Sequence, residues 1–215
     1  MTIVLISLAA ATLGAAIGFG IRRHIATLSY RDIDEVDLPE PGPRNWLIWT
    51  SAIAWAGLGA LLDTTDSWAL APVLLPLAVA GPSLAAIDLD VMRVPNRILG
   101  PVAFVTLVGL ASTILAQGDT ATAVRGVIGG AVTGAVFWLM NALSRDGIGF
   151  GDVKLAALVG VVAASVSLYT VWLGLLVGSL AALLWTKSRR RSGPLPYAPW
   201  LLFGGWVALI ATAWG

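Results

Sequence analysis

The sequence predicts an all-α, polytopic membrane protein. Of its 215 residues, 58% are hydrophobic and 12% are charged, whereas a soluble domain is nearer one-quarter charged. The mean hydropathy is +0.86. Apolar stretches of about 17–25 residues, the length that crosses a bilayer, recur along the whole chain. We therefore expect one integral-membrane domain over residues 1–215, with about eight transmembrane helices.

Taken in chain order, the apolar segments predict membrane helices at about residues 2–21, 46–62, 69–87, 98–116, 123–143, 153–165, 168–186 and 197–214. The first has no basic residues ahead of it, which predicts a retained helix rather than a cleaved signal peptide. The sixth, at about 13 residues, is short for a span, so we expect it to extend through 165–167 or to lie in a thinned region. Glycines at four-residue spacing in several segments predict close helix packing.

One connection is longer than the others, at residues 22–45. It holds an acidic stretch from Asp32 to Glu40, and the prolines within 39–43 make its end non-helical. Its composition indicates no particular role, and we expect a solvated connector.

Scarce residue types exclude several kinds of site. The chain contains no cysteine, which excludes disulfides, cysteine-ligated zinc and cysteine nucleophiles. Its one histidine, His24, argues against a histidine-based metal site and against a Ser-His-Asp triad. The net charge of +1 gives no general case for nucleic-acid binding. We therefore expect no metal site and no nucleic-acid partner.

Basic residues predict the orientation in the membrane. If the first segment begins outside, the loops 22–45, 88–97, 144–152 and 187–196 are cytoplasmic. These loops and their edges hold all of the 13 lysines and arginines except Arg125. Because positive loops stay in the cytoplasm, this orientation is expected. The run from Lys187 to Arg191 would fix the topology and meet anionic lipid.

Two aspartates lie at the ends of apolar segments on this predicted cytoplasmic side. Asp88 ends one segment and Asp152 begins another. Taken alone, Asp152 could be a helix N-cap after a glycine turn, and Asp88 and Asp90 could be interfacial charges. Two carboxylates that meet across a helix bundle are, however, the minimum equipment for acid–base hydrolysis of a peptide bond.

The chain resembles the type IV prepilin peptidases. The first likeness is Ile87-Asp88, followed after six residues by Pro95-Asn96. The second is the Gly-x-Gly-Asp motif in Gly149-Phe150-Gly151-Asp152-Val153-Lys154-Leu155. Weaker likenesses are Pro196-Tyr197-Ala198-Pro199-Trp200, Gly204-Gly205 and Gly18-Phe19-Gly20.

The resemblance implies that Asp88 and Asp152 are catalytic, with support from Gly149, Gly151, Pro95, Asn96 and Lys154. Asp90 competes for the first role, and Asp88 is preferred because the family's acid stands just ahead of the spacer to Pro-Asn. Lys154 is close enough in sequence to Asp152 to bias the pair, yet we expect it to anchor its helix at the headgroups. We likewise expect Arg93 and Arg97 to reach the interface rather than a substrate.

The resemblance also implies the partners and the location. The substrates would be prepilins or pseudopilins, cleaved after a short basic leader at the cytoplasmic face of the inner membrane. Bifunctional members carry a four-cysteine zinc site and methylate the new N-terminus. With a loop of about 24 residues and no cysteine, we expect a compact form without that zinc site. No cofactor is expected, except S-adenosylmethionine if methyltransferase activity is retained; the oligomeric state stays open.

Two other functions fit parts of the sequence. Other intramembrane aspartic proteases share Gly-x-Gly-Asp, but they place the first aspartate after a tyrosine, whereas Ile87 precedes Asp88 here. A small proton- or cation-coupled transporter or assembly protein could use Asp88 and Asp152 as ion sites. Repeated halves or midspan charges would favour a transporter, and neither is present.

Overall fold

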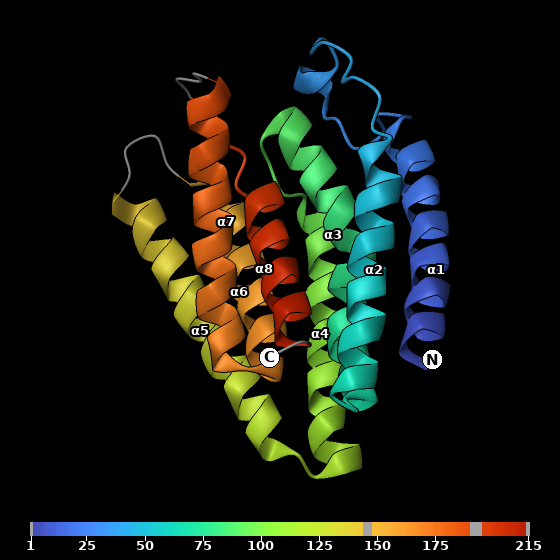
Figure 1. Ribbon diagram of the computed structural model, residues 1–215. Helices are drawn as coiled ribbons and strands as arrows, with labels where there is room; N and C mark the ends of the chain where they lie inside the picture. The colour runs from blue at the N-terminus through green and yellow to red at the C-terminus, as the bar shows by residue number, and fades with distance from the viewer. Residues whose placement is uncertain (1, 144–147, 190–194, 214–215) are drawn as a thin grey trace.

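The computed structural model describes residues 2–143, 148–189 and 195–213, and this part of the chain is helical with no strand. The α-helices are α1 (Thr2–Ile25), α2 (Trp46–Thr64), α3 (Ala71–Val91), α4 (Asn96–Gln117), α5 (Thr120–Leu143), α6 (Phe150–Val166), α7 (Leu168–Arg189) and α8 (Ala198–Thr212). Short 3-10 turns precede α2 and α3, at Ile33–Glu35 and Trp68–Leu70. Each predicted segment is thus confirmed as a helix, and the helices run side by side (Figure 1).

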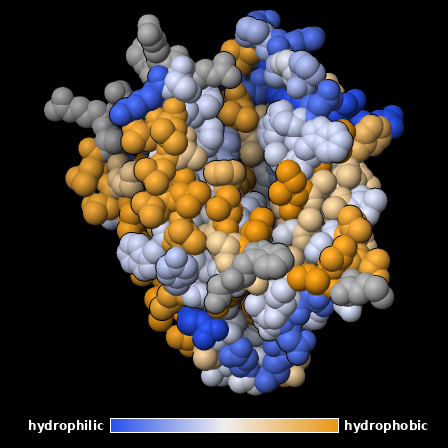
Figure 2. Space-filling view, viewed as in Figure 1, coloured by the Kyte–Doolittle hydropathy of each residue, from blue (hydrophilic) through white to orange (hydrophobic). Residues whose placement is uncertain are grey.

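Six of the helices are long and apolar enough to cross a membrane: α1, α2, α3, α4, α5 and α7. The other two, α6 and α8, have 17 and 15 residues. Because α6 is buried along most of its length, its neighbours rather than lipid cover it. On the face shown in Figure 2, apolar side chains predominate over the middle of the bundle and hydrophilic ones gather toward its two ends, as expected for helices that cross a membrane.

Glycines allow neighbouring helices to approach closely, as their spacing predicts. A Cβ added to Gly18 of α1 would lie 2.5 Å from the Leu47 carbonyl oxygen of α2. One added to Gly178 of α7 would lie 2.6 Å from the Trp200 carbonyl oxygen of α8. Gly129 of α5 and Gly160 of α6 meet in the same way. Three helix pairs, α1–α2, α5–α6 and α7–α8, are therefore packed backbone against backbone.

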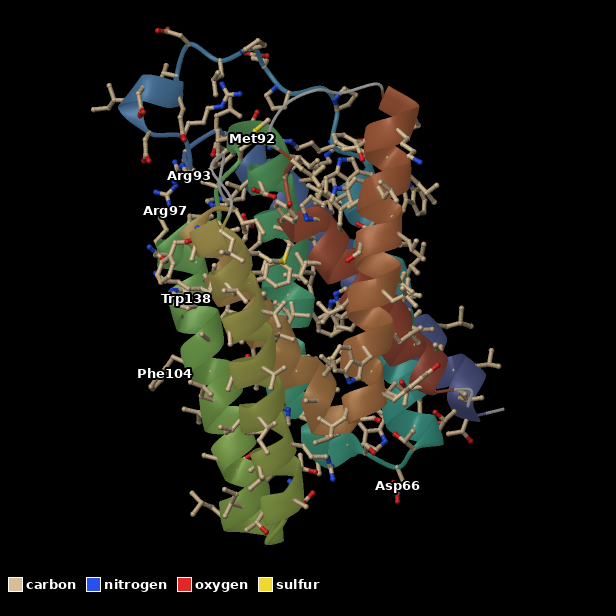
Figure 3. The ribbon with its side chains drawn as sticks, turned by 90° about the vertical axis from the view of Figure 1, so that its left-hand side faces the viewer. Asp66, Met92, Arg93, Arg97, Phe104 and Trp138 are labelled. Atoms are coloured by element: carbon tan, nitrogen blue, oxygen red, sulfur yellow. The ribbon has the colours of Figure 1, made fainter. Side chains whose placement is uncertain are left out.

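The turn between α3 and α4 positions the first predicted motif. α3 ends at Val91, because Met92 adopts a left-handed conformation with φ 51°. Pro95 is extended and caps the start of α4. Met92, Arg93 and Arg97 lie at one end of the bundle and Asp66 at the other (Figure 3).

The loop between α1 and α2 is largely exposed, as expected of a solvated connector, but part of it is anchored. Tyr30 is buried in an apolar cluster with Ile25, Leu47, Ala86 and Ile87. The loop therefore packs against the end of α3, because it supplies an apolar side chain that its acidic composition conceals. Arg145, Arg190 and Arg191, which contribute to the predicted orientation, lie outside the described residues.

Candidate aspartate site

Asp88 is a buried carboxylate in the last turn of α3. Only 1% of the Asp88 surface is exposed. One carboxylate oxygen, Oδ2, accepts a hydrogen bond from the backbone N–H of Ala198 at 2.9 Å. Ala198 is the first residue of α8, where N–H groups have no partner within the helix. The start of α8 therefore holds Asp88 in place by a main-chain donor.

Asp152 lies in the first turn of α6 and is 7% exposed. The residue that precedes the helix as its N-cap is Gly149, so Asp152 is not the N-cap that it could have been when its motif is taken alone. A Cβ on Gly149 would lie 3.3 Å from Asp152 Oδ2, which makes this glycine a close neighbour of the carboxylate. The other oxygen, Oδ1, is buried and has no hydrogen-bond partner among the described residues.

The two carboxylates come together between α3 and α6. They lie close enough for the charge of Asp88 to act on Asp152. Within the described ranges, neither carboxylate forms an ion pair with a lysine or an arginine. A buried carboxylate without a cation is costly, and such groups are found where a site uses them. The structure thus brings Asp88 and Asp152 into one site.

The supporting motif residues connect the two halves of this site. Lys154 Nζ donates a hydrogen bond to Asn96 Oδ1 at 2.9 Å. A Cβ on Gly151 would lie 3.0 Å from the Val94 carbonyl oxygen, so glycine favours this close approach of α6 to the turn before Pro95. Both contacts join the start of α6 to the start of α4.

Three basic residues that were expected to reach the interface also contact other parts of the chain. Lys154 bonds to Asn96 and also lies over the Phe150 ring, 5.0 Å from its centroid. Arg97 Nη2 donates to the Ser29 carbonyl oxygen at 3.2 Å. Arg93 pairs with Asp32 and Glu35, at 2.8 and 2.6 Å. The sequence hid these partners because they come from distant segments.

Asp90 lies outside the aspartate pair. Its carboxylate forms ion pairs with Arg31 at 2.9 Å and with Arg44 at 3.4 Å, and it accepts a hydrogen bond from the Tyr30 hydroxyl. The structure therefore gives Asp88 and Asp90 different partners, and it brings only Asp88 together with Asp152.

Several contact residues were missed by the sequence reasoning. Ala198 lies in the Pro-Tyr-Ala-Pro stretch that the resemblance had singled out. The sequence therefore pointed to this stretch, but it did not predict that the Ala198 N–H donates to Asp88. Asn141 of α5 donates to the carbonyl oxygen of Ile148, just before the second motif. Nothing in the sequence indicated the contacts of three loop residues with Asp90, namely Tyr30, Arg31 and Arg44. Across the residues described here, no group of three or more histidine, cysteine, aspartate or glutamate side chains could hold a metal ion.

The fold and the site together define a multi-pass membrane helix bundle with an aspartate pair buried between two of its helices. More particularly, the chain belongs to the type IV leader peptidase family, whose model matches residues 74–186. This match covers more than half of the 215 residues and includes both aspartate motifs.

The names of curated relatives agree with this family assignment. A prepilin leader peptidase/N-methyltransferase of Aeromonas hydrophila is 32% identical over 182 residues, which are 77% of this chain and 52% of that protein. Proteins of the same name from Pseudomonas aeruginosa and Bacillus subtilis are 28% and 30% identical; they cover 80% and 59% of this chain, and 54% and 50% of their own lengths. The chain therefore spans about half the length of the curated relatives it matches. No solved structure matches it.

Proposed function

We propose that this chain is an aspartic endopeptidase that removes the short basic leader from type IV prepilins or pseudopilins. The observation that carries the proposal is the buried pair Asp88 and Asp152, which has no cationic partner in the described part of the chain. Membership of the type IV leader peptidase family supports the same activity, and the names of the relatives support the substrate class.

The proposed reaction uses the two carboxylates as acid and base. Two close carboxylates do not easily both ionise, so the pair shares one proton. The ionised member takes a proton from a water molecule, which attacks the scissile carbonyl carbon, while the protonated member donates its proton to the carbonyl oxygen. The tetrahedral intermediate then collapses as the leaving amine takes up a proton. Either aspartate can start protonated, because the titration belongs to the pair.

The hydrogen-bond partners of the two carboxylates are consistent with one acting as the acid and the other as the base. The Ala198 N–H holds one oxygen of Asp88, which fixes the orientation of that carboxylate. Oδ1 of Asp152 has no partner among the described residues, so it is free to bind water or the substrate carbonyl. We propose that this end of the bundle faces the cytoplasm of the inner membrane, where the leader of a single-span substrate would lie. The reaction itself needs no metal or cofactor.

N-methylation of the new N-terminus is a second activity that the names of the relatives suggest. It would require S-adenosylmethionine. The mass of the processed substrate distinguishes the two activities, because methylation adds about 14 Da to the peptidase product.

The test is cleavage of a co-expressed prepilin, followed by a gel shift. Asp88→Asn and Asp152→Asn should each lower the cleavage rate by at least about a hundredfold, because each removes a proton-transfer group. Asp119→Asn, at an acid between α4 and α5 that caps Thr122, is the matched control and should cleave normally. Full processing by Asp152→Asn would refute the peptidase proposal, and so would a wild-type chain that cleaves no prepilin.

A further inference from the structure

The loop between α1 and α2 holds the same helix end that carries Asp88. Three loop residues, Tyr30, Arg31 and Arg44, converge on Asp90, and we call these four residues the clasp. Asp88 and Asp90 are two residues apart on α3, so their side chains point about 200° apart. The α3 end is thus held on one side by the Ala198 N–H and on the other by the clasp.

Arg31 makes the strongest contact of the clasp. Its Nε donates to Asp90 Oδ2 at 3.0 Å and its Nη2 to Asp90 Oδ1 at 2.9 Å, which is the two-pronged geometry that lysine does not offer. The side chains of Arg31 and Asp90 are 3% and 6% exposed. A buried ion pair of this kind has a defined geometry, because few other positions satisfy both charges.

Arg31 also reaches back to its own loop. Its Nη1 donates to the Leu38 carbonyl oxygen at 2.9 Å, and its Nη2 to the Pro39 carbonyl oxygen at 2.8 Å. One guanidinium therefore joins both sides of the loop to α3. Arg44, which stands two residues before α2, donates to the Tyr30 hydroxyl at 2.9 Å and faces Asp90 at 3.4 Å. Arg44 therefore connects the start of α2 to Tyr30 and Asp90 as well.

A second set of contacts holds the residues just after Asp88. Arg93 Nη2 donates to the Tyr30 carbonyl oxygen at 2.9 Å, and Arg93 pairs with Glu35 through Nε at 2.6 Å. On the apolar side, Tyr30 belongs to one buried cluster with Ala86 and Ile87, which directly precede Asp88. The loop therefore contacts the α3 end ahead of the aspartate and the turn that follows α3.

We propose that the clasp is a positioning device for Asp88, with Arg31 and Asp90 as its positioning residues. Neither residue belongs to the aspartate pair, so both act through the placement of the α3 end. The proposal rests on the peptidase function proposed above.

The test compares steady-state kinetics of prepilin cleavage for Arg31→Gln, Asp90→Asn and the double variant. Each single change should lower kcat by about tenfold or more while KM stays within about twofold, because a displaced Asp88 slows the chemical step rather than substrate binding. The double variant should be slowed by less than the product of the two single effects, since both changes break the shared Arg31–Asp90 contact. Asp90→Glu, which keeps the charge, should recover part of the rate.

A matched control is Arg23→Gln. Arg23 is an exposed arginine near the end of α1 whose guanidinium lies over the Phe19 ring, and it takes part in none of the clasp's contacts described above. The Arg23→Gln variant should cleave prepilin at the wild-type rate. The amount of folded enzyme is measured by gel filtration, and rates are given per folded molecule. A wild-type kcat in Asp90→Asn would overturn the proposal.

A second readout does not depend on activity. Because the chain has no cysteine, a single Leu89→Cys variant can carry a trifluoromethyl label at an exposed site on the α3 end. Its fluorine resonance should shift when Arg31→Gln or Asp90→Asn is added, and should not shift with Arg23→Gln. An unshifted resonance would refute the clasp even if the wild-type chain proved not to be a peptidase.

Discussion

Two aspartates of α3 show how much the surroundings of a residue decide its role. Asp88 meets a main-chain N–H and a second carboxylate, whereas Asp90 meets two guanidiniums and a hydroxyl. Burial raises the pKa of Tyr30, so its hydroxyl remains a donor to Asp90 at neutral pH. Among the described residues, Asp88 thus has no cationic partner whereas Asp90 is neutralised, although both belong to the same helical turn.

At the same scale, Glu35 makes the attachment of the loop sensitive to acid. The hydrogen bond from Arg93 lowers the pKa of Glu35 below its ordinary value. A lowered folded-state pKa means that the pair stabilises the protein above the unfolded-state pKa of about 4.3, and that this contribution is lost as pH falls through the folded-state pKa. Because Arg93 and Glu35 are partly exposed, the contribution should be at most about 1 kcal/mol.

The thermal midpoint of detergent-solubilised wild type and Glu35→Gln tests this prediction between pH 7 and pH 3. The wild type should be more stable at pH 7, and the difference should vanish at the acid end. Glu40→Gln, at an exposed acid of the same loop, controls for the loss of a negative charge. A difference that grows toward low pH would contradict the expected sign.

At the scale of elements, α5 packs closely against α6, the helix that carries Asp152. A Cβ on Gly160 would overlap Thr133 Oγ1 and would lie 2.6 Å from the Gly129 carbonyl oxygen. Gly160→Ala should therefore destabilise the protein by about 1–3 kcal/mol and slow cleavage, because overpacking pushes α6 away from α5.

The matched control for that change is Gly100→Ala in α4, where an added Cβ meets no atom within 4 Å. Alanine in an open helical position should leave stability unchanged or raise it by up to about 1 kcal/mol. Both variants are compared by unfolding in mixed detergent micelles and by prepilin cleavage. Equal stability of the two variants would argue against the close α5–α6 contact.

The sequence predicts the helices well and their ends less well. All eight apolar segments are helices, because a helix satisfies the backbone hydrogen bonds of an apolar run of this length inside a membrane. The third was expected to end at 87 but continues to Val91, since Asp88 and Asp90 resemble interfacial charges when their partners are unknown. The sixth begins at Phe150 rather than 153, because glycines 149 and 151 resemble a turn.

For the whole molecule, the orientation remains a prediction from the basic residues. The cysteine-free chain allows single-cysteine reporters at each end of the bundle. Val36→Cys, in the loop beside the aspartate end, should react with a membrane-impermeant maleimide only after spheroplasts are lysed. Gln117→Cys, in the last turn of α4, should react in intact spheroplasts. The reverse pattern would place the aspartate pair outside the cytoplasm.

The site is predictable from sequence only where it is contiguous. Both aspartate motifs can be read from short stretches, because each motif is one continuous piece of the chain. The Ala198 donor and the clasp could not be predicted, since they join segments that lie 110 and about 60 residues apart in the chain. An acidic, proline-rich loop also gives no sign that its tyrosine and its arginines face inward.

The clasp has a consequence for how the protein opens locally. A loop of this composition would ordinarily exchange its amide hydrogens rapidly, as segments with few buried contacts do. Here Arg31 holds the carbonyl groups of Leu38 and Pro39 while it pairs with Asp90. The loop and the last turn of α3 should therefore unfold as one cooperative unit, so that protection from exchange is shared between an irregular segment and a helix end.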